Sequence, residues 1–211
     1  MSITLQISES LQKGRLKDVK ELINKALEEG IAADVILNEG LLAGMDIIGG
    51  KFKRNEVYVP EVLIAARAMN AGAEILKPKL VDMGVKAIGK VVLCTVKGDL
   101  HDIGKNLVKM MLEGKGLEVI DLGIDISAEK VVEAVKTHNP EIVALSALLT
   151  TTMGEQKVVI DALKEAGLRD QIKVMIGGAP VTQSYADEIG ADAFTPDAAT
   201  CAEVAKEFVV A

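Results

Sequence analysis

One stretch decides the fold: KVVLCTV at residues 90–96, followed by KGDLHDIGKN at residues 97–106. The first part is a continuous apolar run, which predicts a buried strand, and residues 107–112 repeat apolar side chains at helical spacing. His101 therefore lies in the loop that leaves the carboxyl end of a strand, two residues after Asp99. In open α/β sheets this edge is where ligands bind.

Strands and helices alternate from residue 89 onward. The predicted strands are Val91–Val96, Glu118–Leu122, Ile142–Ser146, Lys173–Ile176 and Ala193–Thr195. The predicted helices are Ile103–Gly114, Ala128–Thr137, Thr152–Ala166, Gln183–Ile189 and Ala198–Phe208. This pattern predicts an α/β fold, a five-stranded parallel doubly wound sheet in the flavodoxin-type order 2-1-3-4-5. The switch point then lies between the first and third strands, so the His101 loop and Ser146 both flank the expected crevice.

The preceding part of the chain is expected to be helical. A short segment at residues 4–11, an apolar face at 16–27, a second at 35–52 and a helix opened by Pro60 predict a four-helix bundle. The boundary is expected in 83–89, a short linker with two glycines. We therefore expect two domains, residues 1–84 and 89–211.

Composition excludes several classes of protein. The net charge of −7, the absence of Trp and the scarcity of aromatic residues argue against nucleic acid as a partner. No apolar run is long enough to span a bilayer, and the amino terminus lacks the pattern of a signal peptide. Cys94 and Cys201 are isolated and are expected to be buried core thiols in a reducing compartment. We expect a cytoplasmic protein without a membrane partner.

His101 could be a general base, a metal ligand or an ordinary loop residue. Zinc requires three or four ligands at motif spacing, and neither a zinc nor a haem-attachment spacing is present. A single histidine suits a metal whose remaining ligands come from a macrocycle, with Asp99 fixing the tautomer of the ring. His138, at an expected helix end, is discounted as a surface residue, and Asp102 and Lys105 are expected to be solvated, with Asp102 at a helix N-terminus.

Three motifs carry a resemblance to a known family. They are Asp99-x-His101-x-x-Gly104, Ser146-x-Leu148 and Gly177-Gly178. Together they resemble the cobalamin-binding signature, at the spacing that the family uses. Nearly the whole chain is similar to the corrinoid proteins of methylamine, methanol and betaine methyltransferase systems. It is most similar to the methylamine type, the trimethylamine and dimethylamine corrinoid proteins, through the sequences at 148–153 and 177–182.

The resemblance implies a cofactor, cobalamin or a related corrinoid, in the methylcob(III)alamin and cob(I)alamin states. The nucleotide tail would leave cobalt and enter the crevice, and His101 would replace it as axial ligand, the base-off/His-on mode. A proton-linked network of His101, Asp99 and Thr152 is implied, with threonine in place of the family's serine. The implied cofactor-binding residues are Asp99, His101, Gly104, Ser146, Leu148, Thr150, Thr152, Gly177 and Gly178.

The resemblance also implies a role as a non-catalytic carrier subunit. A substrate-specific methyltransferase would load a methyl group from a methylated amine or betaine, and a second methyltransferase would pass it to a thiol or a tetrahydropterin. A reductive activase would be a third partner. The helical domain would cap the methylated cofactor, with Tyr58, Val59 and Leu63 as candidate contacts.

Other classes remain as alternatives. A cobalamin-binding subunit of a B12-dependent mutase shares the three motifs but lacks the helical cap. A B12-sensing regulatory protein adds a DNA-binding helix-turn-helix, which the acidic charge disfavours. Flavodoxins and receiver domains share the topology, but the Gly98–His101 loop resembles neither a hydroxyl-rich phosphate loop nor an acidic phosphorylation site.

Overall fold

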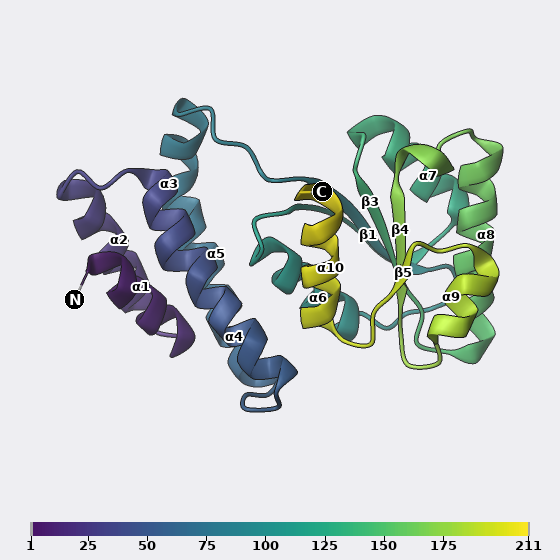
Figure 1. The fold of residues 1–211 in the computed structure, drawn as a ribbon, viewed down its shortest axis with the longest axis horizontal. Helices are drawn as coiled ribbons and strands as arrows, with labels where there is room; N and C mark the ends of the chain where they lie inside the picture. Colours follow the sequence, from purple (N-terminus) through teal and green to yellow (C-terminus); the bar gives the residue numbers. More distant parts are fainter. Residues whose placement is uncertain (1, 211) are drawn as a thin grey trace. The chain divides into compact units, whose positions relative to one another are not determined.

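The computed structural model describes residues 2–210. The chain forms two compact units (Figure 1). One consists of the residues up to 87 together with 114–116, and the other of residues 88–113 and those from 117 onward.

The first unit is helical. Its elements are α1 (Ile3–Gln12), α2 (Leu16–Glu28), α3 (Ala33–Val35), η1 (Ile36–Leu42), α4 (Ala43–Lys53) and α5 (Val59–Asp82). The π-helical η1 joins α3 to α4 without a break, so the described part of this unit is the predicted bundle of four helices. Pro60 is the second residue of α5, where its missing N–H leaves no hydrogen bond unmade.

Apolar side chains and a small residue hold the bundle together. Val19, Ile23 and Ala26 form the buried face of α2, as the helical spacing predicts. Gly72 of α5 faces this helix, and a Cβ atom at Gly72 would lie 2.7 Å from Cδ1 of Ile23. The close approach of α2 and α5 therefore requires glycine at this position.

The second unit is an α/β domain. Its strands are β1 (Lys90–Val96), β2 (Glu118–Ile126), β3 (Ile142–Ser146), β4 (Lys173–Gly177) and β5 (Ala193–Phe194). Its helices are α6 (Ile103–Glu113), α7 (Ala128–His138), α8 (Thr150–Glu165), η2 (Arg169–Gln171), α9 (Gln183–Ile189) and α10 (Ala198–Val210). All strand pairs are parallel and the order is β2-β1-β3-β4-β5, which confirms the predicted topology.

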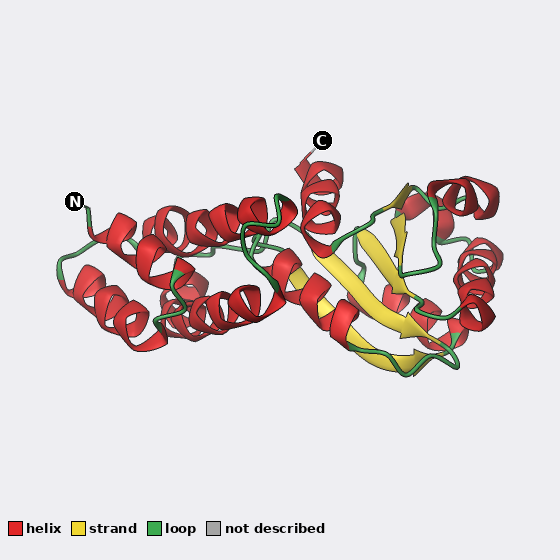
Figure 2. Ribbon diagram, turned by 90° about the horizontal axis from the view of Figure 1, so that it is seen from below, coloured by secondary structure: helices red, strands yellow, loops and turns green. Residues whose placement is uncertain are grey.

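The sheet lies between two layers of helices. Helices α6 and α10 cover one face, and α7, α8 and α9 cover the other (Figures 1 and 2). Strand β1 lies inside the sheet, between β2 and β3, and is buried from Val91 to Val96, as a parallel strand covered on both faces must be. Between residues 2 and 210, no helix combines the length and apolarity that crossing a bilayer requires.

Both cysteines are buried in this unit. Burial raises the pKa of Cys94 to about 12 and that of Cys201 to about 11. The thiols therefore stay protonated at neutral pH, as expected of core residues.

The strand register brings three loops to one edge of the sheet. Thr95 of β1 pairs with Ser146 of β3, and Ser146 pairs with Gly177 of β4. Because these strands are parallel, the segments that follow them leave the sheet at the same level. The His101 loop, the Ser146 loop and Gly177-Gly178 are therefore neighbours.

Candidate corrinoid site

Asp99 lies at the centre of this edge and joins two of its loops. Its side chain has no exposed surface. The Oδ1 atom accepts hydrogen bonds from Nδ1 of His101 at 2.7 Å and from the backbone N–H of His101 at 3.1 Å. The Oδ2 atom accepts from the Leu148 N–H at 2.7 Å, the Leu149 N–H at 3.3 Å and the Thr152 hydroxyl at 2.7 Å. One carboxylate thus binds the loop after β1, the loop after β3 and the start of α8.

These donors set the charge state of Asp99. Burial acts to raise the pKa of the carboxyl, but hydrogen bonds from the His101 ring, the Thr152 hydroxyl and the backbone N–H groups act against it and hold the pKa well below its usual range. Asp99 is therefore an ionised carboxylate at neutral pH and can only accept hydrogen bonds.

The ionised partner fixes the tautomer of His101. Because Asp99 only accepts, Nδ1 of the neutral imidazole carries the proton, and Nε2 keeps its lone pair. The His101 side chain is 49% exposed, so the ring is half open to a ligand. Thr95, buried in β1, donates from Oγ1 to the carbonyl of His101 at 2.9 Å and holds the backbone at that residue. The geometry is that of one oriented nitrogen ligand.

The glycines at this edge differ in their surroundings. Gly178 has φ of +133°, and a Cβ atom there would lie 1.7 Å from the carbonyl oxygen of Ala147. A Cβ atom at Gly177 would lie 3.3 Å from the carbonyl oxygen of Thr195, whereas one at Gly104 would meet nothing within 4 Å. Gly178 is thus required by the close approach of the chain's own loops, and Gly104 borders open space at the start of α6.

The remaining residues of the three motifs lie around His101. Ser146 ends β3 and is half-buried, Leu148 is 40% exposed, and Thr150 is exposed at the start of α8. Thr152, two residues further on, turns inward to Asp99 and is buried. All three motifs therefore border one region of the surface.

Large apolar side chains are exposed beside His101, next to the exposed Asp102. Leu100 is 68% exposed and Ile103 is 77% exposed, and both lie within two residues of His101. One imidazole cannot hold a free metal ion alone, and within residues 2–210 no group of three or more His, Cys, Asp and Glu side chains gathers. The single nitrogen and its apolar surroundings fit a metal that brings its other ligands in a largely apolar macrocycle.

Comparison with known proteins identifies the family. Residues 89–205 match the B12 binding domain family, and residues 5–77 match a second family described as a B12 binding domain. The chain is 46% identical over 177 residues to the trimethylamine corrinoid protein of Methanosarcina barkeri. The matched region covers 83% of this chain and 82% of that protein. The chain belongs to the B12-binding corrinoid proteins. It is also 41% identical to dimethylamine corrinoid protein 2 of Methanosarcina acetivorans, over 97% of this chain and 95% of that protein.

Solved structures agree with this assignment. A cobalamin-binding protein from Desulfitobacterium hafniense matches with a TM-score of 0.82 and 33% identity, over 99% of this chain and 98% of that one. The methanol:cobalamin methyltransferase complex MtaBC from Methanosarcina barkeri matches with a TM-score of 0.88 and 32% identity, over 99% of this chain and 80% of that one. The cofactor of this corrinoid protein is accordingly cobalamin or a related corrinoid, as its sequence predicts.

Lys105 is not solvated, and that expectation was wrong. Its side chain is 3% exposed, and Nζ lies 2.8 and 2.7 Å from the two carboxylate oxygens of Asp121. Lys105 occupies the first turn of α6, on the side that faces β2, where the lysine is buried and its partner Asp121 is partly buried. Asp102 is exposed at the start of α6, and His138 is the exposed last residue of α7.

The candidate cap residues of the corrinoid protein lie at the start of α5. Tyr58 is 65% exposed, and Val59 and Leu63 are half-buried. Tyr58 immediately precedes the helix, and its backbone N–H donates to Oε2 of Glu61 at 3.2 Å. Of the three side chains, that of Tyr58 has the most surface available for a contact.

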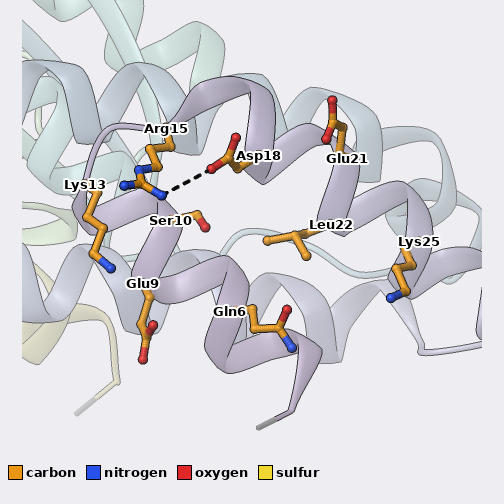
Figure 3. A pocket seen from close by; sticks show the side chains of 9 residues that line it. All are labelled: Gln6, Glu9, Ser10, Lys13, Arg15, Asp18, Glu21, Leu22 and Lys25. Atoms are coloured by element: carbon orange, nitrogen blue, oxygen red, sulfur yellow. Dashed lines mark ion pairs between the residues drawn. The ribbon is translucent and has the colours of Figure 1, made fainter.

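The helical unit also has a shallow groove of about 430 Å³ between α1 and α2 (Figure 3). Its lining includes charges of both signs, among them Arg15 and Asp18, which form an exposed ion pair at 3.7 Å. None of the motif residues lines it. Exposed pairs of this kind contribute little free energy, so the groove indicates no specific ligand.

Three polar residues at the site, Thr95, Gln156 and Asp125, were not predicted from the sequence. Gln156 has no exposed surface, and Nε2 donates to the carbonyls of Leu145 at 3.0 Å and Gly177 at 3.1 Å, which ties the end of β3 to that of β4. Its position one turn after Thr152, on the inward stripe of α8, is the signal that could have found it. Asp125 was not predicted because β2 was expected to end at Leu122, whereas it continues to Ile126.

Proposed function

We propose that this corrinoid protein carries a methyl group between two methyltransferases and binds its cofactor base-off with His101 as axial ligand. The observation that carries the proposal is the pair formed by Asp99 and His101 at the switch point of the sheet. It supplies one imidazole nitrogen with a fixed tautomer, half open and with the exposed side chains of Leu100 and Ile103 beside it. When bound, the cobalt of the corrinoid would accept a methyl group and give it up again.

The protein's own part in this chemistry is to hold a ligand and a proton. With Nδ1 bonded to Asp99, His101 presents Nε2 to the metal. The proposed proton-linked network of His101, Asp99 and Thr152 would hold a proton when His101 is not coordinated. The Thr152 hydroxyl and the Leu148 N–H hold the carboxylate during both states. The oxidation state of the metal would thereby be coupled to protonation of His101.

The nucleotide tail is assigned to the crevice between the loops after β1, β3 and β4. Ser146 offers a hydroxyl at the end of β3, and Gly104 borders open space. Thr150 and Leu148 are exposed at the same edge. These groups are the proposed contacts of the tail, with Gly177-Gly178 shaping the adjacent turn.

The helical unit is proposed to be a cap domain over the methylated face, with residues 1–84 as the cap and 89–211 as the cofactor-binding domain. Its match to a second B12 binding domain family over residues 5–77 supports this role. Tyr58, Val59 and Leu63 are the proposed contacts. A cap would keep water and side reactions away until a partner docks.

The methyl donor is proposed to be a methylated amine, because several similar proteins are named for trimethylamine or dimethylamine. A substrate-specific methyltransferase would be the first partner, by analogy with the methanol:cobalamin methyltransferase complex. The second methyltransferase, acting on a thiol or a tetrahydropterin, and the reductive activase complete the proposed set, all in the cytoplasm.

The test of this function is reconstitution with hydroxocobalamin. Apoprotein is incubated with the cofactor, freed of excess, and analysed for cobalt content and visible spectrum. We expect stoichiometric cobalt in the wild-type protein and a spectrum that changes in His101→Ala. The chain's other histidine provides the matched control, because His138→Ala removes an exposed imidazole from the end of α7.

Methyl transfer to the corrinoid protein is then measured with three substrate-specific methyltransferases, those that act on trimethylamine, dimethylamine and methanol. Loss of transfer in H101A with normal transfer in H138A is the expected result. Failure of correctly folded wild-type protein to retain cobalt would overturn the proposed binding mode.

A further inference from the structure

Asp125, near the end of β2, has a strained backbone that core packing does not explain. Its φ is +55°, in the left-handed region. Among the non-glycine residues from 2 to 210, Asn55 and Asn139 also have a positive φ. Asp and Asn tolerate this conformation better than most residues. Because the side chain of Asp125 is exposed, the conformation serves some purpose other than filling the core.

Two hydrogen bonds join Asp125 to the His101 loop. Its Oδ1 atom accepts from the N–H of Gly98 at 2.7 Å, and its own backbone N–H donates to the carbonyl of Asp99 at 3.1 Å. A single residue of β2 thus holds two consecutive residues of the loop after β1. Gly98 has φ of +78°, a conformation that glycine adopts without strain, and glycine also permits many others, so the hydrogen bond from its N–H to Asp125 restricts a permissive position of the loop.

An irregular strand register brings Asp125 to this position. The pairing of β1 with β2 shifts twice, so that Cys94 pairs with Gly123 but Val96 pairs with Ile126. Ile124 and Asp125 therefore both lie opposite the single residue Thr95, so β2 has one extra residue here. Such bulges re-aim side chains and are frequent beside functional sites.

We propose that Asp125 is a positioning residue for His101, acting through Asp99. It clamps Gly98 and the Asp99 backbone, so that the Asp99 carboxylate stays directed at Nδ1 of His101. The consequence for corrinoid binding rests on the proposed function, whereas the clamp itself is a property of the apoprotein. Asp125 need not touch the cofactor.

Three substitutions separate the carboxylate from the backbone. Asp125→Asn keeps an acceptor oxygen and a residue that tolerates positive φ. Asp125→Gly keeps the backbone freedom but removes the acceptor, and Asp125→Ala removes both. We expect the Kd for hydroxocobalamin to rise about 10-fold in D125A and D125G, since partners of metal ligands typically contribute 10–100-fold. D125N should restore wild-type affinity and spectrum.

Nitrogen NMR of the imidazole side chains tests the clamp in the apoprotein, because it reports the tautomer of His101. With two histidines in the chain, H138A leaves the signals of His101 alone. We expect a single Nδ1–H tautomer with a hydrogen-bonded proton in the wild type and in D125N, and mixed tautomers in D125A and D125G. Asn139→Ala is the control, because it removes the left-handed residue after α7 and should lower thermal stability without moving the His101 signals.

The outcomes separate the two proposals. Wild-type His101 signals in both D125A and D125G would overturn the clamp, and so would a shift of those signals in N139A. If wild-type protein retains no cobalt, the proposed function fails while the NMR comparison still decides the role of Asp125. Rescue by D125N alone, in tautomer and in affinity, would establish it.

Discussion

Asp99 is the residue on which the site converges, and its charge makes the fold sensitive to acid. Because its folded-state pKa lies below the ordinary value of 3.8, the ionised carboxylate stabilises the fold at pH values above that value. This contribution is lost as the pH falls from there towards the folded-state pKa.

We therefore expect the unfolding free energy of the wild type to fall more steeply than that of Asp99→Asn below about pH 4, where carboxyls titrate. At pH 7, D99N should be less stable by roughly 2–4 kcal/mol, since hydrogen bonds to a charged group contribute about 1.5–3 kcal/mol each. Urea denaturation between pH 7 and pH 3 measures both. Parallel pH profiles for the two proteins would contradict the assignment of an ionised Asp99.

Gly178 and Gly104 predict opposite outcomes for the same substitution. Gly178→Ala would place Cβ 1.7 Å from a backbone oxygen at a positive φ. We expect a loss of about 3 kcal/mol or more, because overpacking and backbone strain each contribute roughly 1–3 kcal/mol. Gly104→Ala meets open space at the start of α6 and should leave stability unchanged or raise it by about 0.5 kcal/mol.

Thermal denaturation of G178A and G104A checks this pair. Cobalt retention then separates their roles further, because G104A should fold normally and lose affinity only if the corrinoid occupies that space. A stable G178A protein would show that the loops after β3 and β4 move apart without penalty.

At the level of elements, α6 is joined to β2 by a buried charge pair. Lys105→Met would leave Asp121 with Lys109, at 3.7 Å, as its remaining cation. Removing one partner of a buried pair is destabilising by about 3–5 kcal/mol, so we expect a loss near the lower end of that range. Asp121→Asn in the same chain should recover part of it, because the unpaired charge is gone.

The matched control is Lys157→Met, which breaks an exposed pair with Asp161 one turn along α8. It should change stability by less than about 0.5 kcal/mol. Equal losses of stability in K105M and K157M, measured by urea denaturation, would contradict the buried position of Lys105 and support the solvated position expected from the sequence.

Sequence patterns predicted the helices and strands well where burial is regular. They predicted the bounds of a strand poorly where its pairing with a neighbouring strand determines its length. Strand β1 is mostly apolar and is buried from Val91 to Val96, so its type and place were readable. Strand β2 continues past Leu122 through Gly123 and Asp125, residues that disfavour strands, because its pairing with β1 outweighs local preference. The π-helical turn of η1 likewise had no signature in the local sequence. It packs closely on α1, since a Cβ atom at Gly40 would lie 3.0 Å from Ile7.

The site shows the same division. The motif residues predicted which loops meet, because parallel strands fix that geometry. Gln156 did give a signal, its place on the inward stripe of α8. The contacts from Thr95 and Asp125 were not predictable, since each depends on a strand register that no spacing encodes. Lys105 was misjudged for the same reason: a lysine gives no sign of a buried partner on another element.

At the scale of the whole molecule, the two units are joined by an exposed segment. Residues 81–88 are exposed, and Gly84 has φ of +71°. Limited trypsin digestion should therefore cut first after Lys86 and release residues 1–86 and 87–211. Lys86→Gln should slow that cleavage, as mass spectrometry would record. Earlier cleavage within α5 or α6 would contradict the proposed domain division.

The bonds of Asp99 have a thermodynamic consequence. Its carboxylate joins Leu148, 49 residues away, to the His101 loop through the chain's own hydrogen bonds. The entropy of ordering these two loops is thus lost when the chain folds, and little of it remains to oppose the arrival of a cofactor. Titration calorimetry should accordingly give a heat capacity change that reflects only the apolar surface covered, with no added contribution from coupled folding.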